Sequence, residues 1–522
     1  MNDVPTLRRS DLAYLLIFAV AAFIACWRMN PRQMPMIVDT QVYFYIAERA
    51  ASGIAPHVSE FDPKNALSML LTGAAMWLGR HFGGDDVMAA RTVSIAVTCA
   101  VMPMLWLCAW RMFASRLAAC AAPAVMLYFS DYLTLAATGS RPKIFLVFFL
   151  AAWLLATTAR RPLLIGALAG ACFLVWQPAL LTLPVSMVAI AVTSVQPVRA
   201  AMLVLAGAAI SILSYELYFL AHGAIGDQLY QTLLFPVQYP KRIPDPLMNL
   251  YRIFSMDEPG GPRNVVMSVY LAAIAAWWTL GLLVPRLRRS WAGNRPDRIA
   301  LVLLAPAALA FLMMDYQGFP DRFFLLPMVA LANAWAVSVL VHAAARAIPW
   351  RPASVLPASV TAIIAIAIVA TAAITWTMSR PYQRYRDLGL DDQRRAAAYV
   401  GKLLERGRSV YVVSALHLLA LNRTSNHTRY GFFPVRIRNM MTKRVREEGR
   451  FLPLKDGLLP DMILVSRMHP TGMPTLLRKY RKLDRPLLAR QGVSTYRRRE
   501  DVGPTVDPPK QRGTTPIGRK GR

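Results

Sequence analysis

DTQVYFYIAERAASGIAPHVSEFDPKNAL, residues 39–67, is a polar stretch that follows the first apolar block of the chain and precedes many more. It gathers acidic residues, a lysine and a histidine in a chain that is otherwise strongly hydrophobic. Charged and titratable groups placed just outside an apolar block indicate a site that acts on a molecule at the membrane face.

The spacing within this stretch predicts a helix that ends at a turn. Asp39, Tyr43 and Ala47 recur every four residues, which places them on one side of a helix. Gly53 and Pro56 then end that helix.

Three charged residues follow the turn. Glu60, Asp62 and Lys64 lie within five residues of one another, so a carboxylate and an ammonium group can converge on one ligand. An alternative interpretation makes Glu60 and Asp62 structural partners of the lysine.

The composition identifies the class of protein around this stretch. Of 522 residues, 56% are hydrophobic and 17% are charged, and the apolar residues come in blocks of membrane length. We therefore expect a polytopic membrane protein. The five cysteines fall in or beside apolar blocks and form no C-x-x-C pair, which argues against a disulfide framework or a zinc site.

Positive charge is concentrated near the C-terminus. The chain carries a net charge of +30, and residues 381–500 hold 26 Lys and Arg against 10 Asp and Glu. Each such cation contributes about 1 kcal/mol beside acidic headgroups, so membrane lipids or phosphate groups are the expected partners. The alternative, nucleic acid, is not expected because no nucleic-acid-binding motif accompanies the charge.

The order of residues 39–67 carries a family resemblance. An Asp after the first span, D-x-x-x-Y-x-x-x-A, a Gly-x-x-Pro turn and F-D-x-K before a short apolar helix together resemble the first external loop of GT-C glycosyltransferases. The similarity is greatest to protein O-mannosyltransferases and the aminoarabinose transferase of lipid A. The resemblance implies that Asp39 is the catalytic acidic residue and that Lys64 contacts the phosphate of a polyprenyl-phosphate sugar. The family usually has Pro-Pro-Leu after this lysine, where this chain has Asn65, Ala66 and Leu67.

The basic turns predict how the chain crosses the membrane. Arg111–Arg116, Arg160–Arg161 and Arg286–Arg298 are expected inside with the N-terminus, which carries Arg8 and Arg9 before an uncleaved first span. The apolar block 163–195 is too long for one span and is broken at Gln177 and Pro178.

These features predict a fold and its domains. We expect an all-α polytopic membrane bundle of about eleven spans over residues 1–380, with outer loop 30–87 carrying the site. A small exported α/β domain over 381–500 and a disordered basic tail over 501–522 follow. The expected location is a bacterial inner membrane, with a cytoplasmic N-terminus and a periplasmic C-terminal domain.

Further candidate residues lie on the expected outer side. The resemblance implies a second acidic residue, Asp131, and an arginine in an R-(Y/F)-x-x-P pattern, Arg322, that clamps the donor phosphate. Arg141 is a further phosphate ligand, with Lys143 on the same turn. The alternatives are a helix cap for Asp131 and interface anchors for the cations.

Four more residues are assigned to substrate binding: Tyr43, His57, Asp62 and Gln177. For His57 the alternative is an ordinary hydrogen-bonding loop residue. Asp315 and Asp321 face the same outer side. The basic run from Arg436 to Arg446 is interpreted either as a solvated face or as a dock for an anionic acceptor or headgroup.

The implied reaction is inverting transfer of a sugar from polyprenyl phosphate to a glycan, lipid or protein acceptor, with Asp39 as base. A lipid-linked donor requires no nucleotide, and the chain has no Gly-rich phosphate loop. No cofactor or metal ligand cluster is expected, although the pattern leaves a divalent metal open.

The alternatives are a lipid or glycan transporter and a noncatalytic scaffold. A transporter is expected to carry charges within its spans or inverted repeats. Here Glu216 and Arg91 are the charges assigned to spans. A scaffold leaves the charged cluster of residues 39–67 unexplained.

Overall fold

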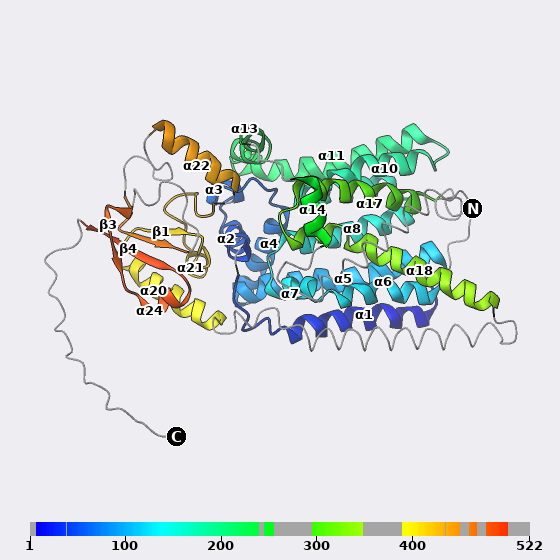
Figure 1. Cartoon of the computed structure of the whole chain (residues 1–522), viewed down its shortest axis with the longest axis horizontal. Coiled ribbons are helices and arrows are strands. Elements are labelled where there is room, and N and C mark those ends of the chain that lie inside the picture. Colours follow the sequence, from blue (N-terminus) through cyan, green and yellow to red (C-terminus); the bar gives the residue numbers. More distant parts are fainter. Residues whose placement is uncertain are drawn as a thin grey trace, which may run out of the picture.

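The computed structural model describes residues 7–37, 39–239, 245–254, 295–347, 389–433, 435–448, 459–466 and 477–499. Helices form an elongated bundle, and a small sheet flanked by helices lies beyond one end of it (Figure 1). The polar stretch 39–67 lies between these two parts.

The bundle contains helices of membrane length. In the described part of the chain, four are long and apolar enough to cross a membrane: α1 (Arg9–Arg28), α5 (Asp86–Phe113), α11 (Pro197–Ala221) and α17 (Pro296–Asp315). Shorter apolar helices accompany them: α8 (Pro142–Thr158), α9 (Pro162–Val175) and α10 (Thr182–Ala191). Helix α18 (Leu326–Ala347) contains a further apolar stretch over Leu326–Val339. The expected spans at 265–284 and 354–378 lie outside the described residues, so the count of about eleven stays a prediction.

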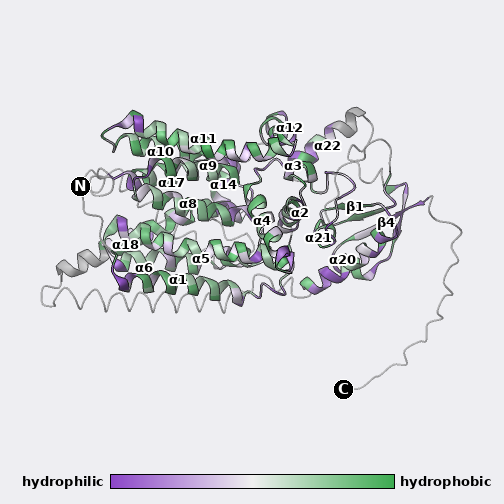
Figure 2. Cartoon of the chain, turned by 180° about the vertical axis from the view of Figure 1, so that it is seen from behind, coloured by the Kyte–Doolittle hydropathy of each residue, from purple (hydrophilic) through white to green (hydrophobic). Residues whose placement is uncertain are grey.

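The outer surface of the bundle is apolar, as a lipid-facing surface must be. Leu16 and Ile17 of α1 and Leu213 and Leu217 of α11 are each about 60% exposed. Hydrophobic residues run along the bundle, whereas hydrophilic residues gather in the sheet region (Figure 2). The chain is therefore a multi-pass membrane protein.

The basic turns gather at the end of the bundle away from the sheet. Arg116 donates to Asp11 near the start of α1 at 2.7 Å. Arg295, just before α17, donates to the backbone carbonyl of Arg111 at 2.9 Å. The N-terminal start of α1 and these turns therefore share one side, as the sequence predicted.

Helix α7 (Ser130–Thr138), which carries Asp131, is largely buried and continues α6 (Arg116–Tyr128) after a bend of 64°. The hydroxyl of Thr134 donates to the carbonyl of Ser130 at 2.7 Å. Because this polar side chain is satisfied within its own helix, the segment packs inside the bundle.

The expected break in block 163–195 is confirmed. Helix α9 ends at Val175, Trp176 is extended, and the short 3-10 helix η1 (Gln177–Leu181) leads into α10. Helix α9 packs closely on α11 through small residues: a Cβ on Gly166 would lie 1.8 Å from the carbonyl oxygen of Val204.

The sheet has four strands in the order β1-β2-β4-β3. They are β1 (Val410–Val413), β2 (Met462–Val465), β3 (Tyr480–Leu483) and β4 (Ser494–Arg498), and only β1 and β2 pair in parallel. Helices α20 (Leu390–Glu405), α21 (His417–Ala420), α22 (Val435–Glu448) and α24 (Pro486–Arg490) accompany them. Apolar spacing in the sequence predicts a helix over 391–406 and strands over 409–414, 461–466 and 493–497, which correspond to α20, β1, β2 and β4. It does not predict β3, because YRKL is charged and has no alternating apolar pattern.

Three short helices join the bundle to the sheet region: α2 (Asp39–Ala51), α3 (Pro56–Ser59) and α4 (Leu67–His81). The apolar stretch 66–78 is too short to cross a membrane and predicts a juxtamembrane helix, and α4 covers most of this stretch.

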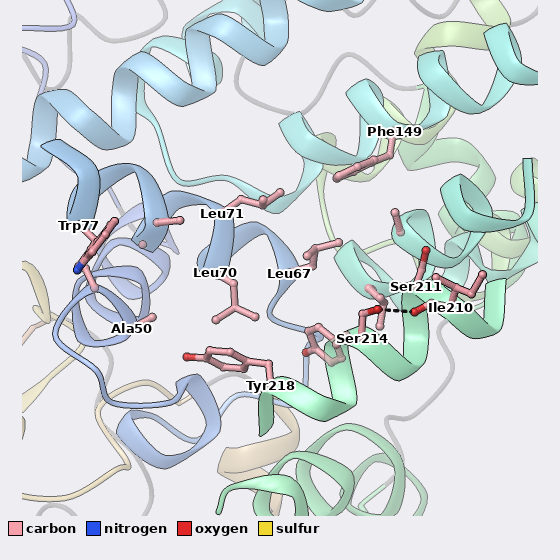
Figure 3. A pocket seen from close by; sticks show the side chains of 16 residues that line it. Ala50, Leu67, Leu70, Leu71, Trp77, Phe149, Ile210, Ser211, Ser214 and Tyr218 are labelled. Carbon is pink, nitrogen blue, oxygen red and sulfur yellow. Dashed lines mark hydrogen bonds between the residues drawn. The ribbon is translucent and has the colours of Figure 1, made fainter. Parts of the chain in front are cut away.

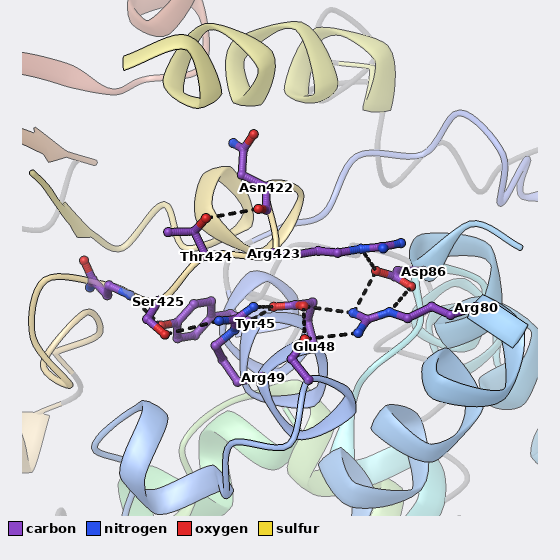
Figure 4. Close-up of polar contacts among 11 residues, drawn as sticks. Tyr45, Glu48, Arg49, Arg80, Asp86, Asn422, Arg423, Thr424 and Ser425 are labelled. Carbon is purple, nitrogen blue, oxygen red and sulfur yellow. Dashed lines mark hydrogen bonds and ion pairs between the residues drawn. The ribbon is translucent and has the colours of Figure 1, made fainter. Parts of the chain in front are cut away.

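An ion-pair network fixes the C-terminal end of α2 (Figure 4). The fully buried carboxylate of Glu48 accepts hydrogen bonds from Arg49 at 2.7 Å and Arg80 at 2.8 Å. Arg80 also donates to Asp86 at 2.9 Å, and Arg423 of the sheet region reaches the same carboxylate at 3.1 Å. Helices α2, α4 and α5 are thereby tied to the segment after α21.

Backbone contacts tie the same two parts together. Glu60 is fully buried and accepts hydrogen bonds from the N–H groups of Gly431 and Phe432, each at 2.8 Å. The N–H of Asn426 donates to the hydroxyl of Tyr45 at 2.8 Å. The sheet region and residues 39–67 therefore lie on the same side of the membrane.

Candidate active site

A cavity of about 480 Å³ lies where the bundle, α2 and the sheet region meet. Seven charged side chains line it: Asp39, Lys64, Arg141, Lys143, Asp315, Asp321 and Arg436. Three are carboxylates and four are cations, and they come from segments far apart in the sequence. The cavity is therefore built by the fold and suits a ligand with anionic groups.

Asp39 begins α2 and reaches the cavity from its N-terminal end. Its Oδ2 lies 3.3 Å from the Nη1 of Arg141, and its side chain is 35% exposed. The Nε of Arg141 donates to the hydroxyl of Thr40 at 2.9 Å, which fixes the guanidinium beside α2. Asp39 is thus oriented by one cation and still open to a ligand.

Lys64 faces the same cavity. Its Nζ donates to the hydroxyl of Tyr43 at 2.6 Å, and the backbone N–H of Lys64 donates to Asp62 at 3.2 Å. Burial opposes the charge on Lys64, but Tyr43, Asp62 and Asp39 outweigh it and raise the pKa of the ammonium above its usual value. Burial raises the pKa of Tyr43 to about 12. At neutral pH the cavity therefore holds an ammonium next to a neutral phenol.

The residues after Lys64 explain how the chain departs from the Pro-Pro-Leu pattern. The side-chain amide of Asn65 donates to the carbonyl of Phe173 at 2.8 Å, and the N–H of Ala66 donates to the hydroxyl of Tyr215 at 2.8 Å. Proline has no N–H and could not make the second bond. Here hydrogen bonds to α9 and α11 hold the segment in place of proline rings.

Gln177 lines the cavity, as expected, whereas His57 and Asp62 lie behind its wall. Gln177 donates to the carbonyl of Pro63 at 2.7 Å. Gln231 accepts from the N–H of Asp62 at 3.0 Å and donates to the carbonyl of His57 at 2.7 Å. Burial lowers the pKa of His57 to about 4, so its imidazole is neutral. These contacts make His57 and Asp62 supports of the loop rather than groups facing the cavity.

A second ion pair completes the cavity. The Nζ of Lys143 lies 3.1 Å from Asp321 and 2.9 Å from the centre of the Trp176 ring. The backbone N–H of Gln317 donates to the other oxygen of Asp321 at 2.8 Å. The sequence placed Lys143 and Asp321 on the outer side but gave no sign that they pair, because the contact joins α8 to a turn much later in the chain.

Arg322 and Asp131 do not line the cavity. The guanidinium of Arg322 is buried, donates to the carbonyl of Arg252 at 2.6 Å and lies 5.7 Å from the ring of Tyr316. The 3-10 turn that aims Asp321 inward turns Arg322 to another face. Asp131 lies in the first turn of α7. Neither residue is among those that line the cavity, and their expected phosphate and catalytic roles stay predictions.

A second, apolar groove of about 680 Å³ adjoins the first cavity (Figure 3). Residues of α2, α4, α8, α9 and α11 line it. Two of them are close in sequence to the first cavity: Leu67 follows Lys64 by three residues, and Leu174 precedes Val175. The hydroxyl of Ser214 donates to the carbonyl of Ile210 at 2.7 Å (Figure 3), and the hydroxyl of Ser211 donates to the carbonyl of Ala167 in α9 at 2.8 Å.

This groove is open to the lipid-facing surface. Trp77 and Ile210 on its rim are 53% and 55% exposed. An apolar chain lying in it would bring its polar end to the segment that carries Lys64.

Among the described residues, no group of three or more His, Cys, Asp or Glu side chains is placed to hold a metal ion. The charged groups that line the cavity are two lysines, two arginines and three carboxylates. This donor set suits an anionic organic ligand.

Solved structures resemble this chain although no family model and no curated protein sequence matches it. ArnT from Cupriavidus metallidurans bound to undecaprenyl phosphate superposes with a TM-score of 0.60 at 12% identity, covering 93% of this chain and 98% of that one. AglB, the oligosaccharyltransferase of Archaeoglobus fulgidus in complex with an inhibitory peptide and a dolichol-phosphate, gives 0.54 at 13% identity, covering 95% and 75%. Both have the GT-C fold, so this chain has that fold, as the resemblance in residues 39–67 implied.

Proposed function

We propose that the chain is a membrane glycosyltransferase that moves a sugar from a polyprenyl-phosphate donor to an acceptor at the outer face. The observation that carries this proposal is the convergence of Asp39 and Lys64 on one cavity beside an apolar groove. A carboxylate base, a phosphate-binding cation and a lipid-binding surface are what such a reaction requires.

Lys64 binds the phosphate of the donor in this proposal. Its raised pKa keeps it charged, and Tyr43 holds its Nζ at 2.6 Å. The polyprenyl chain lies in the apolar groove whose edge begins at Leu67. Solved structures with this fold hold undecaprenyl phosphate and dolichol-phosphate, which supports a donor of this class.

Asp39 acts as the general base. Its carboxylate takes the proton of the acceptor hydroxyl, the acceptor oxygen bonds to the anomeric carbon, and the bond from that carbon to the phosphate oxygen breaks. The electron pair leaves with the phosphate, whose growing charge Lys64 stabilises. Attack from the side opposite the phosphate inverts the anomeric centre.

The location proposed is a bacterial inner membrane, with the N-terminus cytoplasmic and the sheet region periplasmic. Its support is the set of basic turns at the end of the bundle away from the cavity. The sugar and the acceptor, whether glycan, lipid or protein, are left open.

The transporter alternative receives less support. Arg91, the buried cation of α5, donates to the backbone carbonyls of Thr138, Met34 and Pro31. The bonds to Pro31 and Met34 stabilise the segment that connects α1 to α2. Arg91 is thereby a structural residue and not part of an ion pathway.

Replacement of Asp39 tests the proposal. Cells that carry Asp39→Asn are expected to lose about a hundredfold or more of the transferred sugar, because the base is removed. The readout is mass spectrometry of envelope glycans and lipids against a deletion strain. Asp391→Asn, at a carboxylate that is 73% exposed on α20, is the matched control. Wild-type product from the Asp39→Asn strain would contradict the proposal.

A further inference from the structure

The sheet region contributes one charged side chain to the cavity, Arg436 near the start of α22. Its neighbour Ile437 is fully buried in an apolar cluster with Phe61 and Phe235. Because Ile437 anchors the helix on the wall of the cavity, the direction of Arg436 is fixed by packing. Figure 1 shows α22 beside α13 (Phe235–Gln238) at the junction of the two parts.

Arg436 differs from the other cations of the cavity in its partners. Arg141 contacts Asp39, Lys143 contacts Asp321, and Lys64 contacts Tyr43. Within the ranges that the structure describes, the guanidinium of Arg436 makes no hydrogen bond or ion pair, and its Nε is buried from solvent. A guanidinium in this setting is ready to bind an anion without breaking an existing pair.

Arg436 lies in the cavity but not in the apolar groove proposed for the polyprenyl chain. The groove residues Leu67 and Leu174 lie three residues and one residue along the chain from Lys64 and Val175 of the cavity, and no residue of α22 lines the groove. A lipid phosphate that enters from the groove therefore meets Lys64. Helix α22 instead continues from Arg436 to Lys443, whose side chain is exposed to solvent.

We propose that Arg436 binds an anionic group, a carboxylate or a phosphate, on the acceptor, and that the enzyme thereby selects an acidic acceptor. This inference rests on the proposed function, because it assigns to the acceptor the part of the cavity that the donor leaves open. It makes the sheet region a part of the substrate site as well as a support for α2.

The test uses the full chain in lipid nanodiscs saturated with undecaprenyl phosphate. Glucose 6-phosphate and glucuronate serve as anionic probes and glucose as the uncharged one. Both anionic probes are expected to bind at least about tenfold more tightly than glucose, because a charge-assisted hydrogen bond is worth that factor. Arg436→Gln is expected to remove the difference, and Arg436→Lys to retain part of it. Arg438→Gln, at a cation of the same helix that does not line the cavity, is the matched control and is expected to retain it.

Two results would overturn the inference. Competition between the anionic probes and undecaprenyl phosphate, or a tenfold loss of undecaprenyl phosphate binding in Arg436→Gln, would place Arg436 at the carrier phosphate instead. Equal binding of charged and uncharged probes by the wild type would show that Arg436 selects no anion. Failure of the proposed function appears separately, as unchanged product in Asp39→Asn cells.

Discussion

Asp39 and Glu48 lie at opposite ends of α2, and the fold uses the two carboxylates in opposite ways. Asp39 is 35% exposed and has a single long contact, 3.3 Å to Arg141. Glu48 is fully buried and accepts hydrogen bonds of 2.7 Å from Arg49 and 2.8 Å from Arg80. A carboxylate whose bonding capacity is filled by the protein holds structure, whereas one left open to a cavity is available for chemistry.

The same substitution at the two positions should therefore separate activity from stability. Asp39→Asn should lower sugar transfer about a hundredfold or more and leave the unfolding temperature of the purified protein unchanged. Product analysis and thermal unfolding on one preparation give both values. If Asp39→Asn lost activity together with a large fall in unfolding temperature, Asp39 would have a structural role like that of Glu48.

Glu48→Gln should show the reverse. Removing the buried carboxylate leaves Arg49 without its charge partner and Arg80 with Asp86 alone, at a cost of about 3 kcal/mol. We expect a lower unfolding temperature and less protein in the membrane, while the folded fraction keeps its affinity for undecaprenyl phosphate. Unchanged stability would mean that the network in Figure 4 contributes little.

The buried carboxyl group of Glu60 should make the stability of the protein depend on pH. Burial raises the pKa of Glu60 well above its usual value, although the N–H groups of Phe432 and Gly431 act in the opposite direction. Its contribution to stability is thus complete below about pH 4.5 and is lost as the pH rises through the raised pKa. The unfolding temperature should fall over that range in the wild type and fall less in Glu60→Gln. Equal pH profiles for the two proteins would contradict this assignment.

The smallest effect is expected at the edge of the network. The side chain of Arg423 is 55% exposed where it contacts Asp86 at 3.1 Å. Exposed pairs contribute little, so Arg423→Gln should lower the free energy of unfolding by less than about 1 kcal/mol. Denaturant unfolding of Arg423→Gln, Glu48→Gln and the wild type measures the two losses in free energy of unfolding. A loss as large as that of Glu48→Gln would show that the network depends on the sheet region.

The sequence predicted those parts of the site that are close together in the chain. The motif of residues 39–67 indicated Asp39, Tyr43 and Lys64, and all three line one cavity. The break at Gln177 and Pro178 was readable because a polar residue and a proline interrupt a long apolar block.

Contacts between distant segments could not be predicted in this way. The Lys143–Asp321 pair and the position of Arg436 depend on how α8, the turn before α18 and α22 meet. Asp131 in α7 and Arg322 in a 3-10 turn matched local patterns, but neither is among the residues that line the cavity. Local spacing indicates which residue types are present, and tertiary packing decides which of them face the same space.

The central claim is that an ammonium holds the phosphate of a lipid carrier while a separate carboxylate performs the chemistry. Its most direct test is the affinity of the full chain in nanodiscs for undecaprenyl phosphate, measured for the wild type, Lys64→Gln, Asp39→Asn and the exposed control Lys402→Gln. We predict that Lys64→Gln binds at least about tenfold more weakly, because a charge-assisted hydrogen bond is lost, while the other two variants bind like the wild type. Wild-type affinity in Lys64→Gln would contradict the account.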